Sequence, residues 1–211
     1  MTEHNFTKHL RTLNGQRYFS QACQDLFVVA MLDGKTNGVY CEVGGADPYE
    51  SNNTFLLEND YGWSGISLEF DQKLVQQYNT QRRNICICSD ATTFDYRAAF
   101  EKANFPKNID YLSLDIEPAE NTYKSMISIP FDEYRFAVIT YEHDFHLSGE
   151  EYMLKSRDFL KSKGYQIVVQ NVKSFGRDFE DWWIHPSLIL QERWKPYQNN
   201  SIEFSEIFKK T

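Results

Sequence analysis

Short apolar runs alternate with amphipathic stretches along most of this chain. A first helix is expected between Ser20, as its N-cap, and Gly34, because apolar residues recur at helical spacing between them. Five apolar runs of strand length follow, at 39–43, 65–69, 85–88, 109–115 and 136–141. Helical patterns follow these runs in turn, at 53–60, 72–79, 96–103, 120–127 and 150–163. Strands that alternate with helices predict an α/β fold, with a mostly parallel sheet and helices on both of its faces.

The last third of the chain has a different pattern. Residues 165–172 and 187–191 are expected to be strands, separated mainly by the aromatic segment FGRDFEDWWIH. A short connection without helical periodicity is typical of an antiparallel hairpin, here at one end of the sheet. Residues 197–211 are polar with a few apolar positions, so we expect a C-terminal tail or a final docked helix.

The length of 211 residues and the hydrophobic content of 41% fit one domain over residues 1–211, with residues 1–19 as an N-terminal extension. The net charge of -8 argues against a nucleic-acid partner, because nonspecific affinity for nucleic acid comes mainly from basic side chains. The nearest thing to a basic cluster is the pair Arg82 and Arg83. No apolar run approaches the roughly 20 residues that cross a bilayer, and the polar start lacks the apolar region of a secretory signal. We therefore expect a cytoplasmic protein without a membrane span.

Residues 39–69 carry the most informative motif. A strand, a turn at Gly44 and Gly45, a helix and a second strand follow one another, and an acid lies near the end of each strand, Glu42 and Glu69. An acid about 20 residues past such a turn can accept both hydroxyls of a ribose, which is the role expected for Glu69. The two glycines would let the backbone approach this ligand closely. They are followed by ADP rather than by the spaced glycines that hold a pyrophosphate, which favours a phosphate-free nucleoside cofactor.

Acids also follow the next three strands. Asp90 and the backbone of Ala91 are placed to bind an adenine amino group, although Asp90 could instead cap a helix that begins near Thr93. For any single acid, a cap or a solvated loop is a fair explanation. Five consecutive strand ends with acids make that explanation weak for all of them, because an open α/β sheet binds its ligands at these ends.

Four polar residues lie where the reactive end of the cofactor and a substrate would meet: Asp115, Glu117, Glu142 and His143. Carboxylate and imidazole groups can hold a divalent cation, or provide a general base with its orienting partner. His143 is the better base by its intrinsic pKa. The structural alternative is a histidine held by Asp144 or by a carbonyl.

Six motifs in this order and spacing resemble the FkbM-type S-adenosylmethionine-dependent methyltransferases. They are SQACQDLFV, YCEVGGADPYESNNTFLLENDYGWSGISLE, SDAT, IDYLSLDIEPAENT, RFAVITYEHD and FEDWWIHP, and together they span about residues 20–186. The resemblance implies a class I methyltransferase (Rossmann-like) fold, with a seven-stranded sheet whose last strand is antiparallel. It also implies S-adenosylmethionine (SAM) as cofactor and O-methylation of a sugar hydroxyl, for example of a deoxyhexose such as rhamnose in a glycan.

The resemblance also assigns site residues. The positions expected around the cofactor are Glu42, Gly44, Asn53, Glu69, Asp90 and Asp115. The turn departs from the family, because relatives read closer to G-A-N-D-G where this chain has Gly45, Ala46, Asp47 and Pro48. Some related sugar O-methyltransferases use magnesium, which makes Asp115, Glu142 and His143 candidate ligands for Mg²⁺ or Mn²⁺.

For the chemistry, we expect His143 or Glu117 to be the general base, with Asp115 and Glu142 holding a cation or the substrate. A platform for the apolar face of a sugar could come from Phe179, Trp182 and Trp183, whose alternative role is plain core. Four other functions stay open: an O-methyltransferase of a small natural product, an NAD-dependent or nucleotide-sugar enzyme, a metal-dependent hydrolase, and a non-catalytic nucleoside-binding module.

Overall fold

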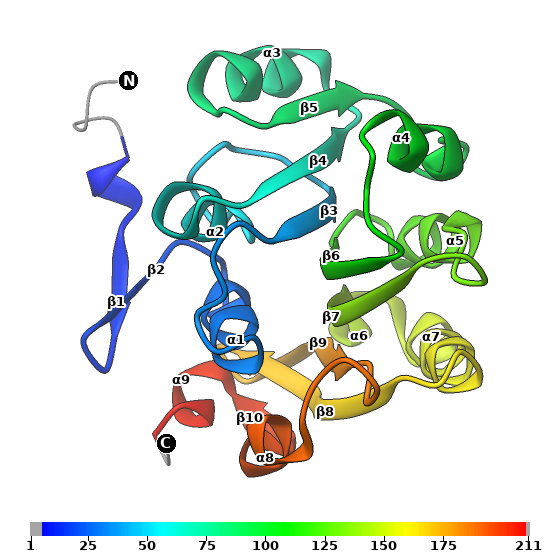
Figure 1. Ribbon diagram of the computed structural model, residues 1–211. Coiled ribbons are helices and arrows are strands. Elements are labelled where there is room, and N and C mark those ends of the chain that lie inside the picture. The colour runs from blue at the N-terminus through cyan, green and yellow to red at the C-terminus, as the bar shows by residue number, and fades with distance from the viewer. Residues whose placement is uncertain (1–5, 210–211) are drawn as a thin grey trace.

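The computed structural model describes residues 6–209 and has an eight-stranded sheet at its centre (Figure 1). From one edge to the other, its strands are β10 (Asn199–Glu203), β8 (Gln166–Ser174), β9 (Arg177–Ile184), β7 (Arg135–Glu142), β6 (Asn108–Leu114), β3 (Val39–Val43), β4 (Ser64–Glu69) and β5 (Ile85–Cys88). Neighbouring strands are parallel except at β9, which runs antiparallel to both β7 and β8. The carboxyl ends of β3, β4, β5, β6 and β7 therefore lie at one edge, where such sheets bind ligands.

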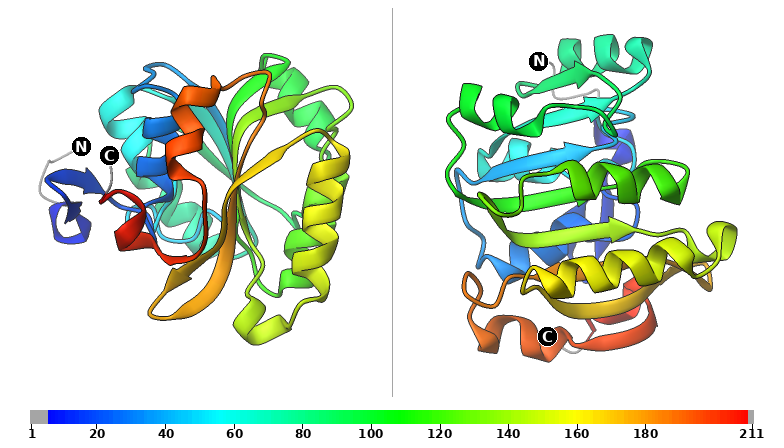
Figure 2. Two further views of the ribbon diagram at one scale, coloured as in Figure 1. Left: turned by 90° about the horizontal axis from the view of Figure 1, so that it is seen from below. Right: turned by 90° about the vertical axis from the view of Figure 1, so that its right-hand side faces the viewer.

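Helices cover both faces of this sheet (Figure 2). One face carries α1 (Gln24–Met31), α2 (Phe55–Tyr61) and α3 (Gln72–Gln81), and the other carries α4 (Tyr96–Lys102), α5 (Ala119–Ser128) and α7 (Glu151–Ser162). Shorter elements lie around them: η1 (Thr7–His9), α6 (Phe145–Ser148), α8 (Gln191–Trp194), η2 (Lys195–Tyr197) and α9 (Phe204–Ile207). The predicted α/β class, with a mostly parallel sheet between two helical layers, is confirmed.

Two predictions about the end of the chain are wrong in detail. The second strand of the expected hairpin is β9, inside the aromatic segment, and residues 187–191 form no strand. The run was misassigned because six consecutive residues of β9 are buried, so the period-2 alternation of a half-exposed strand is missing. The sheet also has eight strands instead of seven, since β10 adds itself in parallel beside β8.

The start of the first helix was also misplaced. Helix α1 begins at Gln24, and its N-cap position is Cys23, whose side chain makes no capping hydrogen bond. Ser20 has another role, because its hydroxyl lies 2.6 Å from Oδ1 of Asp25. Asp25 is fully buried, and burial raises its pKa to about 6.

Side chains from the two faces of the sheet form two main cores. Tyr111, Val138 and Trp182 pack under α1 and α2, whereas Leu112, Ile139 and Trp183 pack under the opposite helical layer. Consecutive residues enter different cores because successive side chains of a strand point to opposite faces. Both tryptophans are fully buried, so the predicted sugar platform is wrong for them.

The described residues of the predicted N-terminal extension have regular secondary structure and contact the rest of the domain. β1 (Arg11–Leu13) and β2 (Gln16–Tyr18) form an antiparallel hairpin. Nη1 of Arg11 donates to the carbonyl of Ser20 (3.1 Å) and Nη2 donates to Oγ of Ser51 (3.3 Å), which ties the hairpin to the ligand-binding edge. At the other end of the chain, α9 buries Ile207, in agreement with the expected docked helix. Residues 1–5 and 210–211 lie outside the described part.

Candidate active site

The glycine turn after β3 lies against the end of β6. Gly44 has φ +96°, and a Cβ added there would lie 1.8 Å from the carbonyl oxygen of Asp115. The amides of Gly44 and Gly45 both donate to the carbonyl of Leu68 at 2.9 Å. Only glycine fits Gly44, because a side chain would meet both a left-handed backbone and a neighbouring backbone atom. Glycine at position 44 therefore lets the turn after β3 pack directly against the backbone at the end of β6.

Glu69 is held at the end of β4 by two backbone donors. The amide of Ala46 donates to Oε2 at 3.0 Å, and the amide of Asp71 donates to Oε1 at 2.9 Å. An ionised carboxylate has about four acceptor positions, so two positions stay available for a ligand. The turn and the acid predicted to bind the ribose are thus joined by a direct hydrogen bond.

A cavity of about 410 Å³ lies above these strand ends. Six residues predicted for the site line it: Gly44, Glu69, Asp90, Ala91, Asp115 and Glu117. The wall also contains residues that the sequence motifs do not predict, above all Phe70, Ile116 and Asn121. Phe70 is 77% exposed directly after Glu69, and a bare aromatic ring beside a predicted nucleoside site is a signal that the sequence offered.

Asp90 does not cap the following helix. Its Oδ1 accepts hydrogen bonds from the amide (2.8 Å) and the hydroxyl (2.7 Å) of Thr92, and these bonds lower the pKa of Asp90. The N-cap of α4 is Asp95, which accepts from the amide of Ala98. The capping alternative for Asp90 is therefore wrong, and Asp90 stays ionised in the wall of the cavity.

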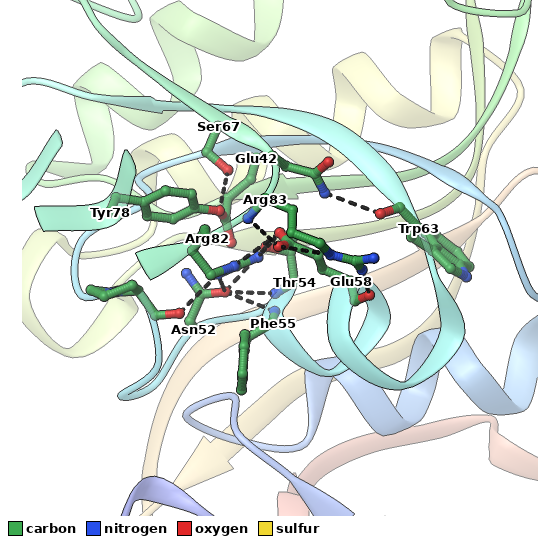
Figure 3. A network of polar contacts seen from close by, with 12 residues as sticks. Glu42, Asn52, Thr54, Phe55, Glu58, Trp63, Ser67, Tyr78, Arg82 and Arg83 are labelled. Carbon is green, nitrogen blue, oxygen red and sulfur yellow. Dashed lines mark hydrogen bonds and ion pairs between the residues drawn. The ribbon is translucent and has the colours of Figure 1, made fainter. Parts of the chain in front are cut away.

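Three residues predicted to bind the cofactor lie outside this cavity wall. Glu42 points into the protein interior, where Ser67 donates to its Oε2 at 2.6 Å and burial raises its pKa to about 7 (Figure 3). The Nδ2 of buried Asn53 donates to Ser113 (3.0 Å) and lies 3.5 Å from Oδ2 of Asp115. Gly45 packs toward β5. None of these three residues lines the cavity.

A second cavity, of about 680 Å³, shares Asp115 and Glu117 with the first. Its walls come from the β1–β2 hairpin, the segment around α6 and the turn between β8 and β9. The lining residues are Arg11, Tyr18, Gln21, Ser51, Asp115, Glu117, Glu142, Asp144, His146, Leu147, Ser174, Phe175, Arg177, Phe179 and Phe204. Phe179, predicted as part of a sugar platform, lies in this wall. Two cavities that meet at the same two acids can hold two ligands side by side.

The acids of the second cavity perturb one another. Burial raises the pKa of Glu142 well above its usual value, and the neighbouring charge of Asp115 raises it further. Burial also raises the pKa of Asp144 and, well above its usual value, that of Glu180, which accepts a hydrogen bond from Gln24 at 2.7 Å. Carboxylates with raised pKa values can take up a proton near neutral pH.

The structure does not bring His143 to either cavity. Its side chain is fully buried, Nδ1 accepts from the amide of Phe145 at 3.2 Å, and Nε2 lies 3.5 Å from Oδ1 of Asp181. Nε and Nη2 of Arg157 bind the same carboxylate at 2.7 and 2.9 Å. His143 is thus an interior histidine whose nearest carboxylate is Asp181, where Asp144 or a carbonyl was expected, and its Nε2 makes no hydrogen bond within the described residues.

The predicted metal ligands do not form a set. Across residues 6–209, no three His, Cys, Asp or Glu side chains are grouped so that they could hold a metal ion. Asp115 and Glu142 are neighbours, but His143 faces Asp181. The residues present do not fit the expected Mg²⁺ or Mn²⁺ site.

In the described part of the chain, no helix is both long and apolar enough to cross a membrane.

No protein-family model matches this chain, and no curated protein sequence matches it. Solved structures do. An O-methyltransferase from Bacillus cereus in complex with SAH aligns with a TM-score of 0.56 at 12% identity, over 80% of this chain and 82% of that one. A protein of Clostridium thermocellum provisionally assigned as an rRNA methylase aligns with a TM-score of 0.52 at 9% identity, over 76% of this chain and 92% of that one. The chain therefore has the class I methyltransferase fold.

Proposed function

We propose that this protein is a SAM-dependent O-methyltransferase that acts on a sugar hydroxyl. The observation that carries this proposal is the pair of cavities that meet at Asp115 and Glu117. Methyl transfer requires a cofactor site and an acceptor site that open onto one another, because the acceptor oxygen must stand in line behind the sulfonium methyl. The class I methyltransferase fold supports the same reading of the smaller cavity.

In the smaller cavity, the cofactor's ribose is assigned to Glu69 and its adenine amino group to Asp90 and Ala91. Glu69 is aimed by two backbone amides, and Asp90 is kept ionised by Thr92, so both can accept hydrogen bonds. Phe70 supplies an exposed ring that can cover the base. Gly44 and Asp115 line the same cavity, where the cofactor would contact both.

For the chemistry, the proton of the acceptor hydroxyl goes to the Asp115 and Glu142 pair. The sulfonium of SAM carries its own activation, so the protein has to position the acceptor and remove one proton. Glu142 lines the acceptor cavity with a raised pKa, which suits a base that works near neutral pH. Glu117 lines both cavities and is the second candidate. His143 supports the turn after β7 from the interior.

The sugar class rests on the sequence resemblance and on the lining of the larger cavity. Carboxylates accept hydrogen bonds from sugar hydroxyls, and the ring of Phe175, which is 96% exposed, offers apolar surface to the C–H face of a sugar. A deoxyhexose such as rhamnose in a glycan is the first acceptor to test, and the hydroxyl of a small natural product is the second. The net charge of -8 disfavours a polyanionic RNA acceptor.

A labelled-cofactor assay tests this function. The protein is incubated with methyl-labelled SAM and, separately, with rhamnose-containing glycans, other glycans, hydroxylated natural products and RNA, and the products are analysed by mass spectrometry. The proposal expects label as a methyl ether on a glycan. Label on RNA or on a nitrogen atom would overturn the sugar O-methyltransferase assignment while keeping the cofactor.

A further inference from the structure

Arg82 is the centre of a buried polar network that reaches the turn after β3 (Figure 3). Its guanidinium is fully buried between the rings of Tyr78 and Phe55, at 4.6 and 5.1 Å from their centroids. Nε donates to Oε2 of Glu58 at 2.9 Å. A buried cation of this kind is tolerated because its charge is paired and its donors are used.

The same guanidinium holds the turn that follows β3. Nη1 of Arg82 donates to the carbonyl of Pro48 at 2.8 Å and to Oδ1 of Asn52 at 3.0 Å. Asn52 in turn donates through Nδ2 to the carbonyl of Gly45 (3.0 Å) and to that of Asp47 (3.3 Å). Arg82 and Asn52 together therefore bind three carbonyls of the turn.

Asn52 is also fixed on its acceptor side. Its Oδ1 accepts from the amides of Thr54 (3.0 Å) and Phe55 (2.9 Å), where α2 begins. The side chain is thus buried and held by groups on both ends of its amide. Asn52 joins the turn, the start of α2 and Arg82 at one point.

The turn depends on these hydrogen bonds because no helix starts directly after the glycines. Ten residues separate Gly44 from α2, which begins at Phe55. In the spaced-glycine motifs a helix follows the turn at once and fixes it. Here the side chains of Asn52 and Arg82 fix the backbone of residues 45–48, and the amide of Ala46 in that stretch donates to Glu69.

We infer that Asn52 and Arg82 are positioning residues for Glu69, which they aim at the cofactor's ribose through the turn at residues 45–48. The inference rests on the proposed function, since Glu69 is assigned to the ribose there. The two residues belong to elements outside the cavity wall, and their effect on the ligand passes through Ala46 and the Glu69 carboxylate.

The Asn52→Asp variant tests this inference with little change in volume. A carboxylate keeps the contacts with Arg82, Thr54 and Phe55 but cannot donate to the carbonyls of Gly45 and Asp47. We expect the Kd for S-adenosylhomocysteine (SAH), measured by calorimetry, to rise by about tenfold, as loss of buried hydrogen bonds in a positioning chain predicts.

Asn84→Asp is the matched control. Nδ2 of Asn84 donates to the hydroxyl of Tyr40 (3.0 Å) and to the carbonyl of Trp63 (3.1 Å), so Asn84 belongs to the same network without touching the turn. A thermal unfolding curve of each variant shows whether the two changes disturb the fold equally. We expect the control to change the Kd for SAH by less than about twofold.

Combination with Glu69→Ala separates positioning from general loosening. If Asn52 acts through Glu69, the double variant Asn52→Asp/Glu69→Ala binds SAH no more weakly than Glu69→Ala alone. Equal SAH binding by wild type and Asn52→Asp, or additive losses in the double variant, would overturn the inference. Failure of the wild-type protein to bind SAH at all would overturn the proposed function instead.

Discussion

The two halves of the ligand-binding edge treat their acids differently. At the proposed cofactor half, Glu69 and Asp90 accept hydrogen bonds from backbone amides and a hydroxyl, and the pKa of Asp90 is lowered. At the proposed acceptor half, Glu142 and Asp144 are grouped with Asp115, and their pKa values are raised by burial and by the neighbouring carboxylate. The comparison indicates that the environment of a carboxylate sets its pKa: exposed hydrogen bonding lowers the pKa of Asp90, whereas burial beside other acids raises that of Glu142.

Replacement of Glu142 by glutamine should have the largest effect. The variant keeps the shape of the acceptor cavity but removes the proposed proton acceptor, so we expect methyl transfer to fall by about 100-fold or more. Binding of SAH, measured by calorimetry, should change little because Glu142 lines only the acceptor cavity. Glu180→Gln is the matched control. Glu180 lies opposite Glu142 on the neighbouring strand and also has a raised pKa, but it lines neither cavity.

The pH dependence of methyl transfer is a second test of the role of Glu142. The raised pKa of Glu142 means that the group loses its proton at a higher pH than an ordinary glutamate. The value of kcat/KM should therefore rise with pH through a range above the usual carboxylate titration, and this rise should be absent in Glu142→Gln. A rising limb that survives unchanged in the variant would assign the proton acceptor elsewhere, with Glu117 as the next residue to test.

Replacement of Glu69 by alanine should act on the other half. Loss of the proposed ribose acceptor should weaken SAH binding by about 10- to 50-fold, the range expected for charge-assisted hydrogen bonds. Turnover at saturating SAM should fall much less than in Glu142→Gln, because the acceptor cavity is intact. Unchanged affinity for SAH would break the assignment of the smaller cavity to a ribose-bearing cofactor.

Glu42 offers a smaller, stability-based test of the acid buried between the two halves. Burial raises its pKa from 4.5 to about 7, so between these values the folded chain binds more protons than the unfolded chain. Stability therefore falls as pH rises through this window, and Glu42→Gln, which cannot ionise, should lose less. In chemical denaturation, the free energy of unfolding of the variant minus that of the wild type should increase from pH 4 to pH 8 by on the order of 1–3 kcal/mol. Asp25 titrates in both proteins and cancels from the difference.

Much of the fold and the placement of the acids could be predicted from the sequence. Alternating strands and helices are enough for a parallel sheet, and the carboxyl ends of parallel strands necessarily share one edge. Glu69, Asp90 and Asp115 accordingly line one cavity, as expected. β9 could not be recognised as a strand from its sequence, because a strand buried on both faces lacks the alternation of polar and apolar residues.

The direction of individual side chains could not be predicted in the same way. Glu42 turns into the interior and His143 turns toward Asp181, although both lie near strand ends. A one-residue difference decides which face of a sheet a side chain enters, and tertiary packing sets that register. Arg82 is half of a basic pair in the sequence, yet it is buried and holds the turn after β3 through contacts that only the folded chain creates.

Calorimetric titration of SAH into the wild-type protein is the decisive test of whether the smaller cavity binds this cofactor. We expect SAH to bind at one site with a Kd below about 1 mM, within the range usual for enzyme ligands, and NAD to show no comparable binding. Absence of SAH binding at millimolar concentration, or binding of NAD in its place, would contradict it.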